Sequence, residues 1–516
     1  MQKPDTTYSR APKRLSDLLA DVTVTHLVGQ THVPVRGIRT DSREVQPMDM
    51  FVAVHGTHTD GHLYVRQAIE TGASTVVVAR DRYEQELRTW LQPDYLTHHN
   101  TTVIVVENTH TALVAFADAF YDNPGASLRL TGITGTNGKT TSSYLLRSII
   151  HSSGGNAGLI GTVEYRIGET SYASQLTTPD PVQLRMLLAR MRDAGCSDVV
   201  MEVSSHALDQ GRVDGLTYQV SVFTNLTQDH LDYHQTRTRY LEAKRRLFTE
   251  YTTGTAVVNF DDPVAETLRT GLTIPVVGYG FSKNADVRIS SLAISETGNA
   301  IRLVTRGSEV DISSPLIGRF NAYNVAAAFA AGLMLDIPPP AIVRGIETVS
   351  RVPGRFDRIT SHDGVSVFID YSHTPDALRN ALVTLREIRD ALHPGARIIT
   401  VFGCGGDRDR EKRPAMGAIA AEFSDLVFVT SDNPRTEDPD AIIADILEGI
   451  PDSRNVTVNR DRRASIGEAI RQARRGDLVL VAGKGHENYQ ILGADRIHFS
   501  DHEVVQEALE QRENGS

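Results

Sequence analysis

A glycine-rich turn at residues 135–140 has the composition of a phosphate-binding loop. It reads Gly-Thr-Asn-Gly-Lys-Thr and lies between a predicted strand, 128–134, and a predicted helix, 139–151. Glycines let backbone N–H groups turn toward a phosphate, Lys139 can reach the β- and γ-phosphates of a nucleotide, and the Thr140 hydroxyl can bind Mg²⁺. The strict Walker pattern requires a glycine where Ile133 stands, so the turn is a variant of that motif.

Several charged side chains follow this turn in the same predicted sheet. Glu202 lies close to the end of a predicted strand, 199–203, where a carboxylate can hold Mg²⁺. His230 follows the next strand, and Lys244 lies on a predicted helix over 238–248. Taken singly, His230 fits a structural loop histidine and Lys244 a solvated lysine. A functional interpretation of these residues depends on the fact that all of them follow the same phosphate loop. His230 and His234 have no third ligand nearby, which disfavours zinc.

The length and composition indicate a chain of several packed domains. With 516 residues it is long enough for about three domains. It has no run of about 18 apolar residues and no secretory signal, and its two cysteines, Cys196 and Cys404, fit a reducing compartment. The 53 basic and 64 acidic residues give a net charge of −11, which argues against general nucleic-acid binding. We therefore expect a cytoplasmic protein with no membrane insertion and no nucleic-acid partner.

Strands alternate with helices along most of the chain, which predicts an α/β fold. We expect a small α/β domain over residues 1–108, a domain with a largely parallel, helix-covered sheet over 109–351, and a second doubly wound domain over 352–516, after a break at Val352-Pro353-Gly354. Each predicted strand of the last domain ends in a polar or glycine-rich loop. Ligand sites of parallel sheets lie beyond the carboxyl ends of the strands, so we expect this domain to have a site of its own. Those strands are predicted at 365–369, 398–402, 426–430 and 478–482.

Taken in order, these motifs resemble the Mur ligases, and most strongly the members that add diaminopimelate. The resemblance is carried by segments 135–141, 202–206, 224–234, 370–375 and 403–409, and it extends from 40–43 to 483–487. It implies an N-terminal UDP-substrate-binding domain, a central ATPase domain of the P-loop type and a C-terminal, Rossmann-like, amino-acid-binding domain. It also implies a monomer.

The resemblance further implies a reaction of bacterial peptidoglycan precursor synthesis. ATP phosphorylates a carboxylate of UDP-N-acetylmuramoyl-L-alanyl-D-glutamate, and an amine of diaminopimelate then attacks the acyl phosphate. Installing a phosphate leaving group on a carboxylate requires a phosphate loop, Mg²⁺ and cations that spread the developing charge. The motifs of this sequence supply a phosphate loop, a carboxylate for Mg²⁺ and cationic side chains.

The resemblance also assigns roles residue by residue. The catalytic positions are Lys139, Glu202, His230 and Lys244. Mg²⁺ is expected at Thr140, Glu202, His230 and Lys244, the last of which matches a family lysine that is carbamylated. ATP is expected at Gly135, Thr136, Asn137, Gly138, Lys139, Thr140, Thr141, Asn321, Asn324, Asp370 and His373. The UDP-linked substrate is expected at Ser42, Thr57, His58, Thr59, Thr177, Thr178, Ser204, Gln210 and Arg212. The amino acid is expected at Arg408, Asp432, Asn433, Pro434, Arg435, Gly483 and Glu487.

Arg435 is the residue that predicts which amino acid is added. Diaminopimelate carries one more carboxylate than lysine, and a guanidinium can bind that group bidentately. Lysine would leave the Arg435 charge unpaired and would be rejected. The resemblance agrees, since the motif Asp-Asn-Pro-Arg at 432–435 marks the diaminopimelate-adding members. Glu487 is expected to hold the distal ammonium group.

The sequence departs from the family pattern at two positions, and several alternative functions remain. Leu176 stands where the family often has Asn before Thr177, and Ser372 stands where Ala is commoner. The alternatives are the same ligation with L-lysine or L-ornithine, a folylpolyglutamate synthetase-like ligase, a nucleotide-dependent switch without ligase chemistry, and a non-catalytic scaffold. A switch would explain the phosphate loop but not a second site at 403–487.

Overall fold

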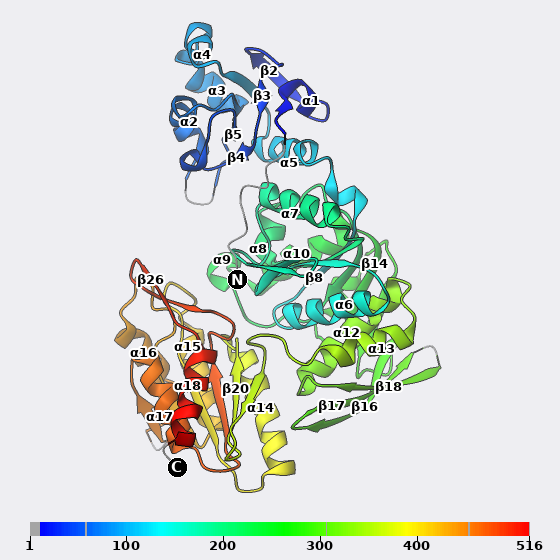
Figure 1. The fold of residues 1–516 in the computed structure, drawn as a ribbon, viewed down its shortest axis with the longest axis vertical. Coiled ribbons are helices and arrows are strands. Elements are labelled where there is room, and N and C mark those ends of the chain that lie inside the picture. Colours follow the sequence, from blue (N-terminus) through cyan, green and yellow to red (C-terminus); the bar gives the residue numbers. More distant parts are fainter. Residues whose placement is uncertain (1–10, 57–58, 306, 453–454, 515–516) are drawn as a thin grey trace.

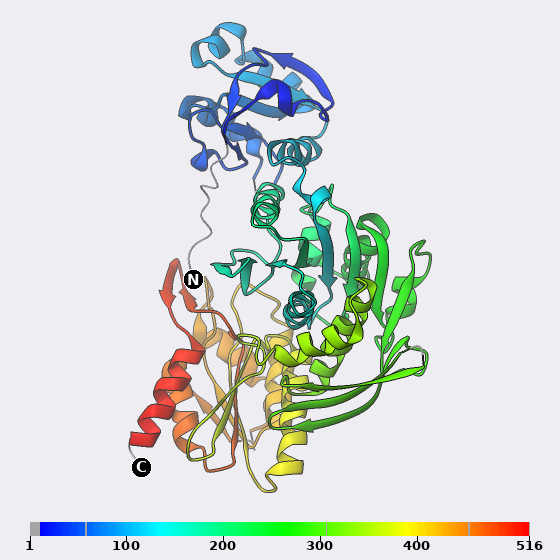
Figure 2. The same ribbon diagram turned by 45° about the vertical axis from the view of Figure 1, so that its right-hand side comes forward.

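Three large sheets follow one another along the chain and occupy three separate parts of the molecule (Figures 1 and 2). The computed structural model describes residues 11–56, 59–305, 307–452 and 455–514. The sheets use strands from residues 24–106, 129–314 and 357–482. Each is covered by helices, and the predicted α/β fold class is therefore confirmed. No helix in the described parts of the chain is long and apolar enough to cross a membrane.

The N-terminal sheet is buried on both faces. The strand that reads Thr-Val-Val-Val-Ala alternates between two cores, since Val76 and Val78 pack on one side and Val77 on the other. The helices on the first side are α2 (Val65–Thr71), α3 (Arg80–Gln85) and α4 (Pro93–His99), and those on the other are α1 (Leu15–Leu18) and α5 (Thr109–Phe120). The strand order is β2 (Val24–Val28), β7 (Thr102–Val106), β6 (Thr75–Ala79), β5 (Met50–Val52) and β4 (Ile38–Arg39), and a short pair, β1 (Lys13–Arg14) and β3 (Pro34–Val35), lies beside it.

The central sheet is parallel in its middle and antiparallel at both edges. The middle matches the expectation of a largely parallel sheet, but the edge hairpins were not predicted. The outer hairpins bury only part of their side chains, so their hydrophobic pattern is weaker than that of the middle strands. The order is β11 (Thr170–Ala173), β10 (Glu164–Ile167), β9 (Ala157–Ile160), β12 (Asp198–Glu202), β8 (Arg129–Thr134), β13 (Tyr218–Phe223), β14 (Thr252–Asn259), β15 (Val276–Gly280), β16 (Val287–Ser295), β17 (Gly298–Thr305) and β18 (Ser308–Ser314).

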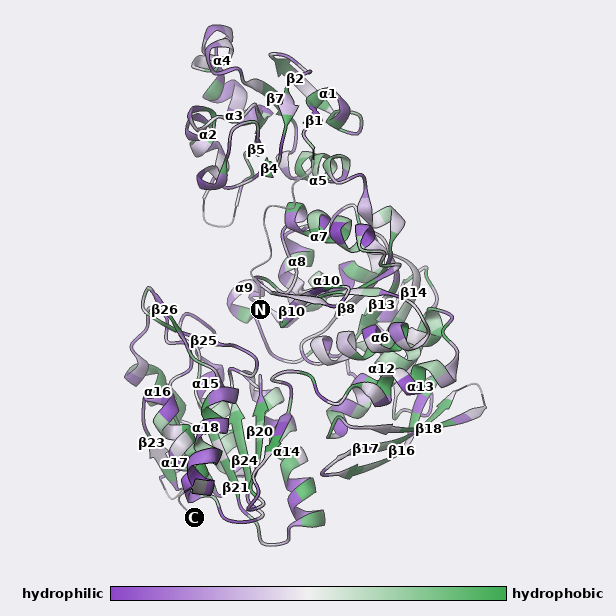
Figure 3. Ribbon diagram, viewed as in Figure 1, coloured by the Kyte–Doolittle hydropathy of each residue, from purple (hydrophilic) through white to green (hydrophobic). Residues whose placement is uncertain are grey.

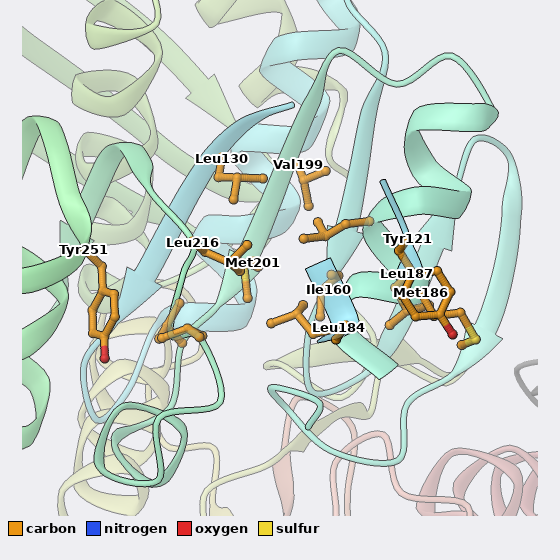
Figure 4. Packing of buried hydrophobic residues seen from close by; sticks show 14 of the residues in the cluster. Tyr121, Leu130, Ile160, Leu184, Met186, Leu187, Val199, Met201, Leu216 and Tyr251 are labelled. Atoms are coloured by element: carbon orange, nitrogen blue, oxygen red, sulfur yellow. The ribbon is translucent and has the colours of Figure 1, made fainter. Parts of the chain in front are cut away.

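Helices cover both faces of the central sheet. Leu130, Val199 and Met201 pack toward Leu184 and Leu187 of α7 (Figure 4). Leu145 and Ile149, and likewise Leu146 and Ile150, are i,i+4 pairs along one helix, and all four are buried in the core of the opposite face. On that face lie α6 (Lys139–Ser152), α12 (Arg319–Met334) and α13 (Pro339–Thr348), and the first face carries α7 (Pro181–Asp193), α8 (Ser205–Asp209) and α10 (Arg237–Arg246).

The C-terminal sheet has hydrophobic strands between helices with hydrophilic outer faces (Figure 3). Its parallel strands end at one edge, and Asp370, Phe402, Val429 and Ala482 are the last residues there. The order is β19 (Asp357–Thr360), β20 (Ser366–Asp370), β24 (Leu478–Ala482), β21 (Ile398–Phe402), β22 (Leu426–Val429) and β23 (Val456–Val458). Helices α14 (Pro375–Leu392), α15 (Lys412–Phe423) and α16 (Pro439–Leu447) cover one face, α17 (Arg462–Gln472) and α18 (Asp501–Asn514) cover the other, and β25 (Tyr489–Leu492) with β26 (Asp495–His498) forms a separate hairpin.

Candidate active site

The phosphate loop joins β8 to α6 and requires glycine at two positions. Gly135 has φ +145°, and a Cβ there would come within 1.9 Å of the Thr224 hydroxyl. Gly138 has φ +89° and caps α6, where a Cβ would come within 2.4 Å of the Asn324 amide oxygen. Glycine, which has no Cβ, allows the loop to pack this closely and to turn its backbone toward the N-terminus of α6. A helix N-terminus is a favourable place for an anion.

Two lysines lie behind this loop. The Lys139 ammonium donates to the carbonyl oxygens of Gly135 (2.9 Å) and Thr136 (2.8 Å), and the Lys244 ammonium also donates to that of Gly135 (2.8 Å). Lys244 is 1% exposed and its Nζ lies 4.3 Å from the centre of the Tyr240 ring. Burial lowers the pKa of both lysines, and the charge of Lys139 lowers the pKa of Lys244 further.

Glu202 is the last residue of β12 and lies beside the phosphate loop. It is 1% exposed, and its Oε2 accepts hydrogen bonds from the hydroxyls of Thr140 (3.1 Å) and Thr162 (2.9 Å). Its Oε1 accepts from the backbone N–H of Thr162 (2.8 Å). A carboxylate and hydroxyls within hydrogen-bonding distance are the hard oxygen donors that Mg²⁺ prefers, so these residues fit that ion.

His230 follows β13 but the hydrogen bonds of the described residues do not join it to Glu202 or Thr140. It has φ +56°, its Nε2 lies 3.3 Å from the Asp229 carboxylate, and its ring stacks edge-on against His206 at 4.7 Å. Burial lowers its pKa to about 3, so the imidazole is neutral and able to accept or ligate. Among the described residues, no group of three or more His, Cys, Asp or Glu side chains is placed to hold a metal ion.

A cavity of about 370 Å³ lies between the central and C-terminal sheets. Its volume falls within the range of small-molecule sites. Five of the residues expected at ATP line it, namely Asn137, Gly138, Thr141, Asn324 and Asp370.

Other residues expected at ATP lie around this cavity rather than on its wall. Asn321 orients Asn324, because its Oδ1 accepts from the Asn324 amide (2.9 Å) while its own amide donates to the Ile317 carbonyl (2.8 Å). His373 Nε2 lies 3.9 Å from Asp229, and burial lowers the pKa of His373. Asp370, in contrast, is part of the cavity wall. Its Oδ2 accepts from the Phe356 N–H (2.6 Å), and burial raises the pKa of its carboxyl group.

Two residues from the C-terminal part reach the phosphate loop and were missed by the sequence analysis. Arg355 donates to the Thr140 hydroxyl (2.9 Å) and stacks over the Tyr371 ring at 4.7 Å. Asp376 Oδ2 accepts from the Asn137 amide (3.1 Å). Arg355 directly follows the Pro-Gly pair that was interpreted as a domain break. In the sequence, a cation directly after such a break is the one signal that could have identified Arg355.

The residues expected at the UDP-linked substrate fall into two groups. In the N-terminal part, the Ser42 hydroxyl donates to Gln67 Oε1 (2.9 Å) and the Thr59 hydroxyl lies 3.4 Å from that of Tyr64. Thr57 and His58 lie outside the described residues. No hydrogen bond of the described residues joins this group to the one in the central part.

The central group surrounds Glu202 and its strand. The Thr177 hydroxyl lies 3.0 Å from that of Thr162, which itself contacts Glu202. The Thr178 hydroxyl donates to the Glu202 carbonyl (2.8 Å) and accepts from the Ser204 N–H (3.1 Å). Arg212 donates to the Thr178 carbonyl (2.9 Å) and to Gln210 Oε1 (2.7 Å). This second group therefore forms one connected wall beside the carboxylate of Glu202.

The residues expected at the amino acid lie in the loops after the carboxyl ends of β21, β22 and β24. Arg435 has φ +54°, and its guanidinium donates only to backbone carbonyls, those of Gly406 (2.7 Å) and Asn433 (3.4 Å). Within the described residues it makes no salt bridge. Glu487 Oε2 accepts from the Asn433 amide (2.9 Å). A Cβ on Gly483 (φ +115°) would come within 2.6 Å of Asp432 Oδ2, which explains the glycine.

Arg408 and Pro434 complete this set. Arg408 is exposed and donates to the Asp407 carbonyl (2.8 Å). Pro434 is buried between Asn433 and Arg435. The guanidinium of Arg435 thus retains donors for a carboxylate. The nearest acidic influence that the described residues show is that of Asp407, whose pKa the charge of Arg435 helps to lower without a salt bridge between them.

Comparison with known proteins gives the same family throughout the chain. Family models described as "Mur ligase family, catalytic domain", "Mur ligase middle domain" and "Mur ligase, glutamate ligase domain" match residues 34–121, 133–332 and 354–485. A UDP-N-acetylmuramoyl-L-alanyl-D-glutamate–2,6-diaminopimelate ligase of Geobacter metallireducens is 43% identical over 96% of this chain and 98% of its own length. The protein of that name from Lactiplantibacillus plantarum is 44% identical over 93% of this chain and 94% of its own length.

Solved structures agree with these relatives. One of a UDP-N-acetylmuramoyl-L-alanyl-D-glutamate–2,6-diaminopimelate ligase has a TM-score of 0.64 and 32% identity, and covers 98% of this chain and 100% of its own. A folylpolyglutamate synthase of Mycobacterium tuberculosis shares the fold alone, with a TM-score of 0.59 and 19% identity over 72% of this chain and 91% of its own. The chain belongs to the Mur ligase family of ATP-dependent ligases.

Proposed function

We propose that this ligase adds 2,6-diaminopimelate to the D-glutamate of UDP-N-acetylmuramoyl-L-alanyl-D-glutamate. The choice of amino acid rests on the surroundings of Arg435. Its guanidinium lies in the Asp-Asn-Pro-Arg loop, contacts only carbonyl oxygens, and has no carboxylate partner in the described chain. The distal carboxylate of diaminopimelate would supply that partner. The names of the relatives support the same substrate.

The first step joins the substrate carboxylate to the γ-phosphoryl group of ATP. A carboxylate oxygen attacks phosphorus, the bond to the β-γ bridging oxygen breaks, and ADP leaves. The chain provides cations and N–H groups for the charge on the transferring group, from the phosphate loop, from Lys139 and from Arg355. The cavity beside Asn137 and Asn324 accommodates the nucleoside part.

Mg²⁺ is the ion that the oxygen donors around Glu202 fit. We propose that Thr140 and Glu202 hold it and that His230 is a further ligand, as the family resemblance implies. When bound, this ion would neutralise charge on the phosphoryl oxygens. We also propose that Lys244 is carbamylated, as the family resemblance implies. Its lowered pKa supports this, since an unprotonated amine is the form that reacts with CO₂.

The second step forms the amide. The amine of the amino acid attacks the acyl carbon, phosphate leaves, and the amine loses a proton to solvent. Arg435 and Arg408 would bind carboxylates of diaminopimelate, and Glu487 and Asn433 would bind its distal amino group. The wall formed by Thr178 and Arg212 would orient the UDP-linked substrate so that its carboxylate faces the phosphate loop.

An amino-acid panel tests the proposed function. The purified chain is given ATP, Mg²⁺ and UDP-N-acetylmuramoyl-L-alanyl-D-glutamate with meso-diaminopimelate, L-lysine or L-ornithine, and both phosphate release and product mass are measured. We expect phosphate release and a tripeptide product with diaminopimelate, and little of either without the UDP-linked substrate. A preference for lysine or ornithine would overturn the choice of amino acid. Turnover of ATP without either co-substrate would favour a nucleotide-dependent switch.

We further propose that the enzyme acts in the cytoplasm as a monomer. Cys196 and Cys404 are buried and free, which suits a reducing compartment. The mass of the purified chain in solution, measured by light scattering, tests the oligomeric state.

A further inference from the structure

Lys484 is a fully buried lysine at the proposed amino-acid site. It follows Gly483 in the loop after β24, and its side chain is 0% exposed. Its ammonium donates to Glu487 Oε2 (3.0 Å) and to Asn433 Oδ1 (3.2 Å). A buried charge is costly unless it is paired and hydrogen-bonded. These two contacts explain why the fold can bury the Lys484 ammonium.

These contacts form a closed triangle between two loops. The Asn433 amide donates to the same Glu487 Oε2 (2.9 Å), and Asn433 Oδ1 also accepts from the Ile491 N–H (3.0 Å). Because an ammonium group only donates, it requires the Asn433 oxygen on its own side and thereby turns the Asn433 amide nitrogen toward Glu487. Lys484, together with the Ile491 N–H, therefore sets the orientation of Asn433 in the loop after β22, and it contacts Glu487 in the loop after β24.

A second buried cation, Arg462, contacts the backbone where the same two loops begin, at the carbonyls of Ser431 (3.5 Å) and Ala482. Arg462 donates to the Ala482 carbonyl (2.9 Å) and pairs with Asp501 at 2.7 Å, and both of these charged side chains are 0% exposed. Arg462 thus contacts backbone, whereas Lys484 contacts the side chains that face the amino acid. A substitution of Lys484 therefore changes the surroundings of the side chains that face the amino acid.

We propose that Lys484 is a positioning and specificity-determining residue for the amino acid that is added. This inference rests on the proposed function. Lys484 holds Asn433 and Glu487 in the geometry that receives diaminopimelate, and its charge offsets that of Glu487.

The charge of Lys484 also bears on the choice between diaminopimelate and lysine. Diaminopimelate with both amines protonated and both carboxylates ionised has no net charge, whereas lysine has a net charge of +1. If Lys484 were neutral, Glu487 would lose the cation that it contacts. Arg462 would remain the more distant cation acting on Glu487, so this partly buried carboxylate would attract the cationic substrate more strongly. Lys484 therefore contributes to the rejection of lysine, in addition to the carboxylate preference of Arg435.

Two variants at this position test the inference. Lys484→Met removes the charge and the donors, and Lys484→Gln removes the charge while keeping an amide that can donate to Asn433 or Glu487. The matched control is Arg496→Met, because Arg496 is an exposed cation over the ring of Tyr489 (3.7 Å), the residue that Lys484 also approaches at 5.4 Å. Arg496 has no described contact with Asn433 or Glu487.

The measurements are kcat and KM for diaminopimelate, kcat/KM for L-lysine, and exchange of label between ADP and ATP in the presence of the UDP-linked substrate alone. For Lys484→Met we expect KM for diaminopimelate to rise about tenfold or more, since hydrogen bonds to a charged group are lost. We expect the preference for diaminopimelate over lysine to fall in both variants. The exchange, which needs no amino acid, should stay within about twofold of wild type, a result that general unfolding would not give.

The outcomes separate this inference from the proposed function. If the wild-type chain does not add diaminopimelate, the proposed function fails. If the wild type adds it and either folded variant keeps the wild-type KM and the wild-type preference over lysine, the role of Lys484 fails. An equal change in Arg496→Met would also overturn it, because the effect would then come from the general charge near Tyr489. Should Lys484→Met not fold, Lys484→Gln alone decides by its preference for diaminopimelate over lysine.

Discussion

Lys139 and Lys244 donate to the same carbonyl oxygen, that of Gly135, at 2.9 and 2.8 Å. One lysine begins α6 and the other lies on α10, so two elements bring two cations to a single acceptor. Like charges this close disfavour each other's protonated form, and the lowered pKa of Lys244 has the charge of Lys139 among its causes. Binding of phosphate near Lys139, or conversion of Lys244 to a carbamate, would relieve the repulsion.

The first prediction concerns CO₂. A neutral Lys244 amine forms an N–C bond with CO₂ and releases a proton, giving an anion in place of a cation. We expect ligase activity to fall when dissolved CO₂ is removed and to return when bicarbonate is added. Lys244→Arg, which cannot form the carbamate, should lose most activity at any bicarbonate concentration. Lys283→Arg, at an exposed lysine, is the control and should behave as wild type; a wild type that is indifferent to CO₂ would contradict the carbamate.

The second prediction concerns the phosphate loop. Lys139→Ala removes a cation from the γ-phosphate side of the loop, and we expect phosphate release to fall by about 100-fold or more, as for loss of one strong electrostatic contact in a transition state. Steady-state phosphate release at saturating ATP measures it. The melting temperature should change little or rise, because one of two repelling cations is removed. Retention of full kcat would exclude Lys139 from the transfer step.

Glu202 gives a prediction about metal affinity. Glu202→Gln keeps the size and an oxygen acceptor for Thr162 but removes the negative charge that Mg²⁺ prefers. We expect the Mg²⁺ concentration for half-maximal activity to rise about tenfold or more. A Mg²⁺ titration of phosphate release checks it. An unchanged Mg²⁺ requirement would place the ion elsewhere.

Arg435 gives a prediction about substrate choice. Both Arg435→Ala and Arg435→Lys should lose most diaminopimelate addition, with kcat/KM lower by about 100-fold, because a bidentate carboxylate contact is lost and lysine does not reproduce the planar guanidinium. Label exchange between ADP and ATP with the UDP-linked substrate should persist. If kcat/KM for diaminopimelate stays at the wild-type value, the carboxylate-binding role of Arg435 is wrong.

A stability prediction follows from the fully buried pair of Arg462 and Asp501. Arg462→Met leaves the Asp501 carboxylate buried without its partner, so we expect the free energy of unfolding of the C-terminal part to fall by about 3–5 kcal/mol. The double variant Arg462→Met/Asp501→Leu should recover much of that loss. Urea unfolding, followed by circular dichroism, measures both. Equal stability of the single variant and wild type would show that water reaches Asp501.

Much of the fold was predictable from local patterns. The strand, glycine turn and helix at 129–152 were expected at nearly the residues where β8 and α6 lie, because buried parallel strands form short apolar runs and α6 has apolar residues at i,i+4 spacing. The edge hairpins β10–β11 and β17–β18 were missed, since their exposed side chains weaken the hydrophobic pattern. The residue roles carried over from the family stay predictions until the variants above are measured.

By itself the sequence determined the local chemistry of each motif: glycines where the backbone has positive φ at 135 and 138, a carboxylate at the end of β12, and an arginine after Asn-Pro. Only the tertiary structure decided which motifs meet. Arg355 reaches Thr140 across 215 residues of sequence, and Lys244 reaches Gly135 across 109. Such contacts depend on how sheets and helices pack, and hydrophobic periodicity specifies which face of an element is buried but not which distant residue lies against it. The triangle of Lys484, Asn433 and Glu487 arises in the same way, from two loops that parallel strands bring to one edge.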